Sequence, residues 1–365
     1  MMRSILLPMV MLLMAAAPPP KAVAVPAPPP GPPLIIAHRG ASAERPEHTL
    51  AAYERAIGQG ADFIEPDLVP TKDHQLVARH ENEISGTTDV TSRPEFAGRK
   101  ATKTIDGETM TGWFTEDFTL AELKTLRAKE RLPQVRPANT AYDGQYEIPT
   151  LAEVIALAKA ASARTGRTIG IYPETKHPSY FRKLGLPIEP VLLKELAAAG
   201  WTTAAAPVFI QSFEIDNLKA LKAQTGVRLI QLMAPAGTSA DGHDYAALAT
   251  PAGLKGVASY AFGIGPEKSM IIPRDAAGKM GAPTNLVADA HAAGLNVHPW
   301  TFRPENIFVP ADLKAGTDPR GRGDVEAEIR VFLATGIDGL FSDSTAAAVR
   351  ALSPAEGPQA NPARN

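Results

Sequence analysis

Several short apolar segments of this sequence end in residues that can carry protons or bind ions and phosphates. The first segment, Leu34–Ala37, is followed directly by His38, Arg39 and Gly40. An imidazole can carry a proton near neutral pH, a guanidinium offers a fork of donors to a phosphate or carboxylate, and glycine lets the backbone turn sharply. A structural histidine beside a surface ion pair would also explain these residues.

The second segment, Asp62–Leu68, contains two acidic residues near its end, Glu65 and Asp67. Side chains alternate between the two faces of a strand, so both carboxylates should point to the same side. Neighbouring carboxylates repel each other, and one stays protonated unless a cation lies between them. A hard divalent cation held by oxygen is the simplest solution. The alternative is an ion pair between one carboxylate and Arg39 or a lysine.

Further apolar runs end in the same way, with polar or aromatic side chains where a strand would stop. These later candidate residues are His80, Glu174, Lys176, Gln211 and Trp300. In a parallel barrel the carboxyl ends of the strands meet at one mouth, which is where such barrels carry their catalytic residues. The order along the chain, strand after strand, therefore predicts one site built from all of them.

The elements that must position these residues are short β-prone runs that alternate with helical patterns. The expected strands are Leu34–Ala37, Asp62–Leu68, Gln75–Ala78, Ile169–Tyr172, Val208–Gln211, Arg228–Leu232, Gly256–Tyr260, Asn296–Trp300 and Gly339–Phe341. The expected helices are Leu50–Ile57, Leu151–Ser162, Pro190–Ala199, Ile215–Gln224, Asn285–Ala293, Val325–Ala334 and Ser344–Ala351. Strands separated by helices predict an α/β fold with a parallel sheet, here a TIM (β/α)8-type barrel.

Two parts of the sequence depart from a plain barrel repeat. Nine runs are one too many for eight positions, and Asp62–Leu68 and Gln75–Ala78 are joined so closely that their pairing should be the irregular one. Residues 82–147 interrupt the alternation and contain only one expected helix, near Leu120–Arg131. We expect an insertion on a strand-to-helix loop, which in a barrel lies on the active-site side.

Composition narrows the class of protein. The chain has 365 residues, a formal net charge of −2 and no cysteine. The near-neutral charge shows no excess of positive charge that would indicate nucleic-acid binding. The absence of cysteine excludes disulfides, thiolate metal ligands and a cysteine nucleophile.

The N-terminal segment predicts export. Arg3 precedes an apolar run from Ile5 to Ala17, which is too short to span a bilayer and is typical of a secretory signal peptide. We expect a signal peptide over residues 1–24, a proline-rich linker over 25–33, the barrel over 34–353 and a loose tail over 354–365. The protein would then be periplasmic or secreted, with no integral membrane domain after signal removal. An uncleaved N-terminal anchor is the alternative.

These residues make the chain resemble the glycerophosphodiester phosphodiesterase family, particularly its larger exported bacterial type. The matching motifs are His38-Arg39-Gly40-Ala41, Pro46-Glu47-His48-Thr49, Glu65-Pro66-Asp67, Thr71-Lys72-Asp73, the Val77 to His80 strand end, Glu174-Thr175-Lys176, Gln211-Ser212-Phe213, Trp300-Thr301 and Asp338-Gly339. They extend over nearly the whole expected barrel, and the cluster from Ala37 to His80 is the most specific part.

The resemblance implies a role for each candidate. Those matching metal ligands, commonly of Ca2+, are Glu65, Asp67 and Glu174. Those matching the general acid and base are His38 and His80, and those on the substrate side are Arg39 and Lys176 at the phosphate, Trp300 at the glycerol pocket, and Gln211. Three protein carboxylates favour Ca2+ over Mg2+, which rarely uses such a cage, although Mg2+ stays an alternative.

Two residues depart from the family pattern. His48 stands where Asn is usual, and Glu81 follows His80 where Asp is common. We expect neither change to touch a proposed ligand or proton carrier, and we therefore expect activity to be retained.

The implied reaction is hydrolysis of a small glycerophosphodiester to glycerol 3-phosphate and an alcohol. One alternative is phospholipase D-like cleavage of lysophospholipid or sphingomyelin, which would need an apolar rim such as Trp113, Phe114 and Phe118 could supply. The other is a non-catalytic protein that binds glycerophosphodiesters, which should have lost a key histidine or carboxylate.

Overall fold

The structure is a computed structural model that describes residues 31–353. The expected signal peptide, most of the linker and the expected tail lie outside the described residues. None of the helices within residues 31–353 combines the length and the apolar character needed to span a bilayer.

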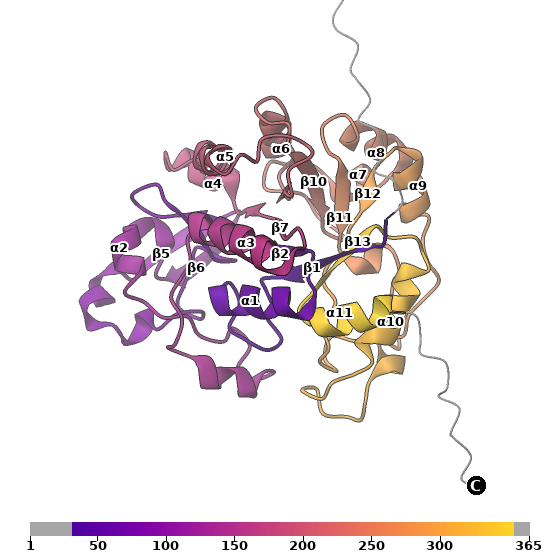
Figure 1. Ribbon diagram of the computed structural model, residues 1–365, viewed down its shortest axis with the longest axis horizontal. Coiled ribbons are helices and arrows are strands. Elements are labelled where there is room, and N and C mark those ends of the chain that lie inside the picture. The colour runs from indigo at the N-terminus through magenta and orange to yellow at the C-terminus, as the bar shows by residue number, and fades with distance from the viewer. Residues whose placement is uncertain (1–30, 354–365) are drawn as a thin grey trace, which may run out of the picture. The chain divides into compact units, whose positions relative to one another are not determined.

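The described part of the chain forms a barrel of parallel strands surrounded by helices (Figure 1). The eight strand positions are β1 (Leu34–His38), β2 (Phe63–Glu65) continued by β3 (Asp67–Pro70), β7 (Gly170–Ile171) continued by β8 (Glu174–Thr175), β9 (Phe209–Ser212), β10 (Arg228–Met233), β11 (Gly263–Pro266), β12 (Asn296–Val297) and β13 (Gly339–Ser342). Neighbours follow the orders β13-β1-β2-β7 and β12-β11-β10-β9-β8-β3. The predicted α/β barrel is therefore confirmed.

The barrel closes between the two ends of the sequence. β1 pairs with β13 in parallel, with Leu34 opposite Gly339. The Phe341 amide donates to the Pro299 carbonyl at 3.0 Å, which joins β13 to the segment after β12. Two strand positions are each split near a proline, Pro66 and Pro173, because proline cannot donate to the ladder.

The ninth predicted run is the irregular one, as expected. β4 (Leu76–Ala78) folds back antiparallel on β3, with Leu68 opposite Ala78. The insertion follows and contains the hairpin β5 (Ala101–Ile105) and β6 (Glu108–Gly112) and the short helix α2 (Leu120–Leu123).

The helices fill the connections between strands. They are α1 (Leu50–Gln59), α3 (Leu151–Thr165), α4 (Pro178–Lys183), α5 (Ile188–Ala198), α6 (Ile215–Lys222), α7 (Tyr245–Leu248), α8 (Pro251–Val257), α9 (Leu286–Ala292), α10 (Val325–Leu333) and α11 (Thr345–Leu352). The capping box predicted before α3 is present: Thr150 Oγ1 accepts from the Glu153 amide, and the Glu153 carboxylate accepts from the Thr150 amide.

Two element predictions were wrong. The strand expected at Gly256–Tyr260 is the end of α8 and the turn after it, and the strand lies at Gly263–Pro266. The helix expected near Leu120–Arg131 ends at Leu123, because the Arg127 amide donates to Asp89 Oδ1 at 2.8 Å instead of to a helical carbonyl.

The barrel interior is closed below the mouth by large side chains. Its core consists of Ile36, Phe63, Tyr172, Phe209, Ile230 and Phe341. The rings of Tyr172 and Phe209 stack with centroids 4.9 Å apart. Because side chains alternate along a strand, Phe63 in this layer puts Glu65 on the same side, one level nearer the mouth.

Candidate active site

Three buried carboxylates converge at the mouth of the barrel. Glu65, Asp67 and Glu174 each offer an oxygen within 4.8 Å of the others, and all three side chains are buried. Pairing of β3 with β8 brings Asp67 opposite Glu174. The alternation that placed Glu65 and Asp67 on one side of a strand therefore leads to a compact acidic cluster.

Each carboxylate has specific partners. Glu65 accepts from the Arg39 amide at 2.7 Å and from Gln211 Nε2 at 3.0 Å. Asp67 Oδ2 lies 2.9 Å from His48 Nε2, whereas Asp67 Oδ1 is buried with no hydrogen-bond partner among the described residues.

The third carboxylate, Glu174, pairs with a lysine from its own strand. Lys176 Nζ lies 2.9 Å from Glu174 Oε1. Burial and the neighbouring Asp67 carboxylate raise the pKa of Glu174 to about 8, although Lys176 opposes this shift. Burial and Asp67 also raise the pKa of Glu65 well above its usual range.

This acidic cluster fits a hard cation. Its carboxylates crowd one another, and Asp67 contributes an oxygen that no described residue satisfies. Hard divalent ions such as Ca2+ take several carboxylate oxygens as ligands. The oxygens of Glu65, Asp67 and Glu174 could therefore hold such an ion, and its charge would offset their mutual repulsion.

His38 lies beside this cluster and is oriented by a carboxylate. Its Nδ1 contacts Asp343 Oδ1 at 2.6 Å. Burial and the neighbouring Arg39 lower the pKa of His38 to about 4, so the ring is neutral at pH 7. With the Nδ1 proton donated to Asp343, Nε2 carries the lone pair.

His80 is held in a similar way. Its Nδ1 contacts Glu81 Oε1, and its side chain is 28% exposed. Burial, together with the charges of Arg39 and Lys176, lowers the pKa of His80 to about 3. Both imidazoles therefore have one nitrogen fixed by an acidic side chain.

A cavity of about 120 Å³ lies between these groups. Its lining residues are His38, Arg39, Glu65, His80, Glu174, Gln211, Phe213, Leu232, Trp300, Thr301, Arg303 and Phe341. Seven of the nine residues predicted from the sequence are in this set. Of the other two, Asp67 belongs to the acidic cluster and Lys176 lines an adjoining pocket.

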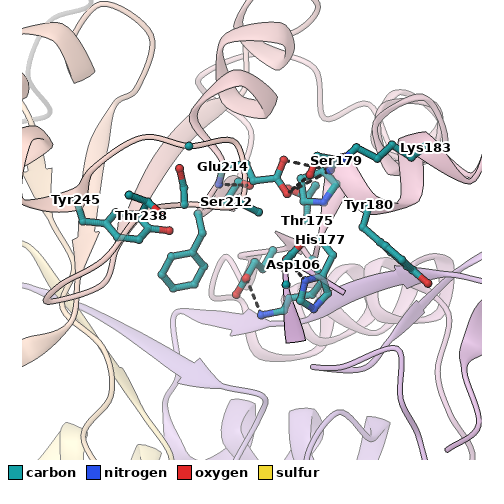
Figure 2. A pocket seen from close by; sticks show the side chains of 18 of the residues that line it. Asp106, Thr175, His177, Ser179, Tyr180, Lys183, Ser212, Glu214, Thr238 and Tyr245 are labelled. Carbon is teal, nitrogen blue, oxygen red and sulfur yellow. Dashed lines mark hydrogen bonds and ion pairs between the residues drawn. The ribbon is translucent and has the colours of Figure 1, made fainter. Parts of the chain in front are cut away.

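The adjoining pocket, of about 750 Å³, shares Glu174 and Phe213 with the cavity (Figure 2). Asp106, from the tip of the β5–β6 hairpin, contacts His177 Nδ1 at 2.5 Å, and both line the pocket. Hydroxyl groups are frequent in its lining: Thr104, Thr175, Ser179, Tyr180, Ser212, Thr238, Ser239 and Tyr245. The pocket is suited to a polar group.

Trp300 separates the cavity from a third hollow. Its Nε1 donates to the Gly265 carbonyl at 2.8 Å, and its ring meets that of Phe213 edge to face at 5.8 Å. The hollow, of about 340 Å³, shares Trp300, Thr301 and Arg303 with the cavity. The indole is therefore a fixed wall between two chambers.

Asp343 was missed by the sequence reasoning. It follows β13 directly, so the rule that polar residues follow apolar strands could have found it. Both family departures also touch the site: His48 contacts Asp67, and Glu81 contacts His80. The prediction that neither change touches a proposed ligand or proton carrier was therefore wrong, because each of the two residues contacts one.

Comparison with known proteins gives consistent matches. Residues 38–347 match the model of the Glycerophosphoryl diester phosphodiesterase family. The chain is 38% identical over 327 residues to a glycerophosphodiester phosphodiesterase of Arabidopsis thaliana, covering 86% of this chain and 84% of that one. It is 30% identical over 304 residues to a glycerophosphodiester phosphodiesterase of Haemophilus influenzae, covering 75% and 80%.

Solved structures resemble the barrel at low sequence identity. An Oleispira antarctica phosphodiesterase in complex with the product sn-glycerol-3-phosphate superposes with a TM-score of 0.59 at 21% identity, covering 88% of this chain and 97% of that one. A glycerophosphodiester phosphodiesterase from Agrobacterium tumefaciens gives a TM-score of 0.52 at 18% identity, covering 87% and 99%. At these identities the likeness supports the fold.

Proposed function

The chain belongs to the glycerophosphoryl diester phosphodiesterase family and is an enzyme of that class, and on this basis we propose that it uses a divalent cation and two histidines to hydrolyse glycerophosphodiesters. The products are glycerol 3-phosphate and an alcohol. The product named for the Oleispira antarctica relative agrees with this proposal.

One observation carries the proposal: an acidic cluster and two imidazoles meet at a single cavity. Glu65, Glu174, His38 and His80 all line it, and Asp67 completes the cluster behind them. A phosphodiester is anionic and its alkoxide leaving group is strongly basic. Its cleavage needs charge neutralisation and proton transfer at one place, and this cavity brings groups for both together.

Positive charge at the cavity would bind the phosphate. Arg39 lines the cavity, and its buried Nε forms an ion pair with Asp67 Oδ2 at 3.3 Å but no hydrogen bond to any residue in the described range. Lys176 stands at the edge of the adjoining pocket. A cation held by the acidic cluster would further draw charge from the phosphoryl oxygens. We assign Ca2+ as the favoured ion, because three protein carboxylates supply an oxygen cage.

The histidines would move the protons. One imidazole takes the proton from the attacking oxygen, which belongs to water or to a glycerol hydroxyl of the substrate. The other must first take up a proton from water, which the charge of a bound anionic phosphate would favour, and it then gives this proton to the departing alkoxide, so that it leaves as an alcohol. Each transfer typically contributes a factor of roughly 10²–10⁴ to the rate. The acidic partners Asp343 and Glu81 keep the two rings oriented for these steps.

The adjoining pocket favours a water-soluble diester over a lipid. Its wall is rich in hydroxyl groups and includes charged side chains of both signs, such as Asp106 and Lys183. The aromatic residues that could have formed an apolar rim for acyl chains, Trp113, Phe114 and Phe118, are at most 8% exposed and pack in the core. The non-catalytic alternative loses support as well, since every proposed ligand and proton carrier is present.

Turnover with and without chelator tests the proposal. Purified protein should release glycerol 3-phosphate from glycerophosphocholine, lose this activity in excess EGTA and EDTA, and regain it when Ca2+ is restored. His38→Ala and His80→Ala should each abolish turnover and leave the far-ultraviolet circular dichroism unchanged, because both residues line the cavity. Full activity in excess chelator would rule out the metal, and a near wild-type rate for His80→Ala would remove that residue from the mechanism.

We also propose that the protein is exported. The support is the N-terminal sequence alone, with its charged Arg3 and short apolar run. Fractionation of cells expressing the full chain tests this: the mature protein should lack the first residues and appear outside the cytoplasm.

A further inference from the structure

Arg136 is a buried arginine of the insertion that contacts the carboxylate behind His38. Its Nη2 donates to Asp343 Oδ2, while Asp343 Oδ1 contacts His38 Nδ1 at 2.6 Å. The same guanidinium donates from Nε to Glu305 Oε1 and from Nη1 to the Ser42 carbonyl, both at 2.8 Å. Its side chain is 6% exposed. Arg303 Nε also donates to Asp343 Oδ2, at 3.2 Å, so the two arginines together hold Asp343 beside the imidazole.

Arg131 repeats this arrangement for His80. Its Nη1 donates to Glu81 Oε1 at 3.0 Å and its Nη2 to Glu81 Oε2, which makes a two-bond fork. Glu81 Oε1 in turn contacts His80 Nδ1. Arg131 Nε also donates to Glu47 Oε1 at 2.8 Å, and Glu47 accepts from Arg39 Nη1 at 3.1 Å.

We propose that Arg131 and Arg136 are positioning residues, which fix the two catalytic histidines through Glu81 and Asp343. The inference rests on the proposed histidine chemistry. It gives the insertion, residues 82–147, a function in the reaction: one short segment of it holds the acid and the base in register with each other.

Anchoring of the insertion to the barrel is the competing explanation. An anchor would need only an ion pair with any surface carboxylate. Arg127 of the same segment makes contacts of this simpler kind, although its partners belong to the insertion itself. It donates to the carbonyls of Lys124 and Leu126 and lies 3.8 Å from Glu147. The carboxylates bound by Arg131 and Arg136 instead each contact the imidazole of a histidine that lines the cavity.

The two explanations predict different kinetics. A carboxylate that loses a guanidinium donor is held less firmly, and the imidazole bonded to it then loses its orientation. Misplacement of a proton carrier slows the chemical step, so the loss of either arginine should lower kcat. Loss of Arg136 should leave KM unchanged, whereas loss of Arg131 should also raise KM, because Arg131 Nε holds Glu47 beside Arg39.

The test uses the full chain with Ca2+ and glycerophosphocholine, and three variants. Arg131→Gln and Arg136→Lys should lower kcat about 10–100-fold, as loss of an outer partner of a site commonly does. Arg127→Gln is the matched control from the same segment, and its kcat and KM should equal those of the wild type. Thermal melting of each variant checks the fold. If Arg136→Lys melts early, Arg131→Gln carries the test, because its side chain is 25% exposed and tolerates replacement better.

A second substrate separates positioning from general damage. The glycerophosphodiester of p-nitrophenol has a leaving group that departs without a proton. A variant that disorders the acid should therefore lose much less activity on this substrate than on glycerophosphocholine, while one that disorders the base should lose the same factor on both. We expect one of Arg131→Gln and Arg136→Lys to show the first behaviour and the other the second.

Three results would overturn the inference: wild-type kcat in both variants, a loss confined to KM, or an equal loss in Arg127→Gln. Equal losses on both substrates in both variants would also count against it, because general damage acts in that way. A wild-type protein that turns over neither substrate would instead contradict the proposed function, so the two failures are distinguishable.

Discussion

At the scale of single residues, His48 shows how a family departure can be absorbed by its surroundings. Its side chain is fully buried, with Nε2 at 2.9 Å from Asp67 Oδ2 and Nδ1 at 2.8 Å from the hydroxyl of Tyr53. Burial lowers the pKa of His48, so the ring is neutral at pH 7 and donates one proton. A donated hydrogen bond to Asp67 orients that carboxylate, and an asparagine amide could supply the same bond.

This contact predicts the effect of replacing His48. His48→Leu removes the donor and leaves Asp67 free to turn, so the Ca2+ concentration for half-maximal activity should rise about 10–100-fold. His48→Asn, the control, should stay close to the wild type. The measurement is a Ca2+ titration of glycerophosphocholine turnover in calcium-buffered solution. Equal affinities in the leucine and asparagine variants would show that the contact does not orient the ligand.

The sequence was informative about which residues meet at the cavity and less so about how they are held. Alternation along a strand places Glu65 and Asp67 together whatever the rest of the fold does. The partner of His38, in contrast, is Asp343, 305 residues away. Neither residue's neighbours in the chain indicate that pairing, because it depends on which strands become adjacent when the barrel closes.

At the scale of elements, the turn from β1 into α1 depends on Gly40. Its φ is +89°, and a Cβ built there would lie 2.6 Å from the Ala52 carbonyl carbon and 2.8 Å from the Ala52 Cβ. The turn therefore requires glycine for two reasons: the left-handed backbone conformation and the close approach of α1. It also sets the direction of the two preceding residues, His38 and Arg39.

Gly40→Ala should consequently damage both stability and activity. The left-handed conformation costs an alanine about 1–2 kcal/mol, and the clash with α1 adds about 1–3 kcal/mol. Gly144→Ala is the control, because its φ is +78° and no other described residue lies within 4 Å of the Cβ position. Denaturant unfolding of both variants measures the difference. If the free energy of unfolding falls equally in both variants, the close approach of α1 to Gly40 does not contribute to the cost of Gly40→Ala.

Glycine also explains the main error in predicting elements. β11 reads Gly-Ile-Gly-Pro, a composition typical of turns, yet it is a fully buried strand. A Cβ at Gly263 would lie 2.6 Å from the Asn296 carbonyl oxygen, and one at Gly265 would lie 2.7 Å from Leu232 Cδ2. Packing with the neighbouring strands requires these glycines, and local propensity carries no information about that packing.

At the scale of the whole molecule, the barrel interior contains a titratable group that couples stability to pH. His298 is fully buried beneath the active site, where its Nδ1 lies 2.9 Å from the Tyr172 hydroxyl. Its Nε2 has no hydrogen-bond partner within residues 31–353. Burial lowers the pKa of His298 from 6.5 to about 4, so the folded protein keeps this ring neutral where the unfolded chain protonates it.

The sign of the pH effect follows from that difference. Below pH 6.5 the unfolded chain binds a proton that the folded protein does not, so stability from this residue is present above pH 6.5 and is lost as the pH falls towards 4. The loss at pH 4 should be roughly 3 kcal/mol. Urea unfolding at pH 7 and pH 4 measures this effect in the wild type and in His298→Gln. Between the two pH values, the free energy of unfolding of the wild type should fall by roughly 3 kcal/mol more than that of the variant. A difference between the two proteins that does not change with pH would refute this assignment.

The pairing of β1 with β13 has a consequence for the protein while it is being made. His38 is synthesised 305 residues before Asp343, so a nascent chain has one member of the pair long before the other. A product of premature termination before Gly339 would leave β1 without its neighbour on one side, and an unpaired strand edge is a route to aggregation. Such a fragment would have the acidic cluster and both imidazoles, but it would lack Asp343, the carboxylate that orients His38.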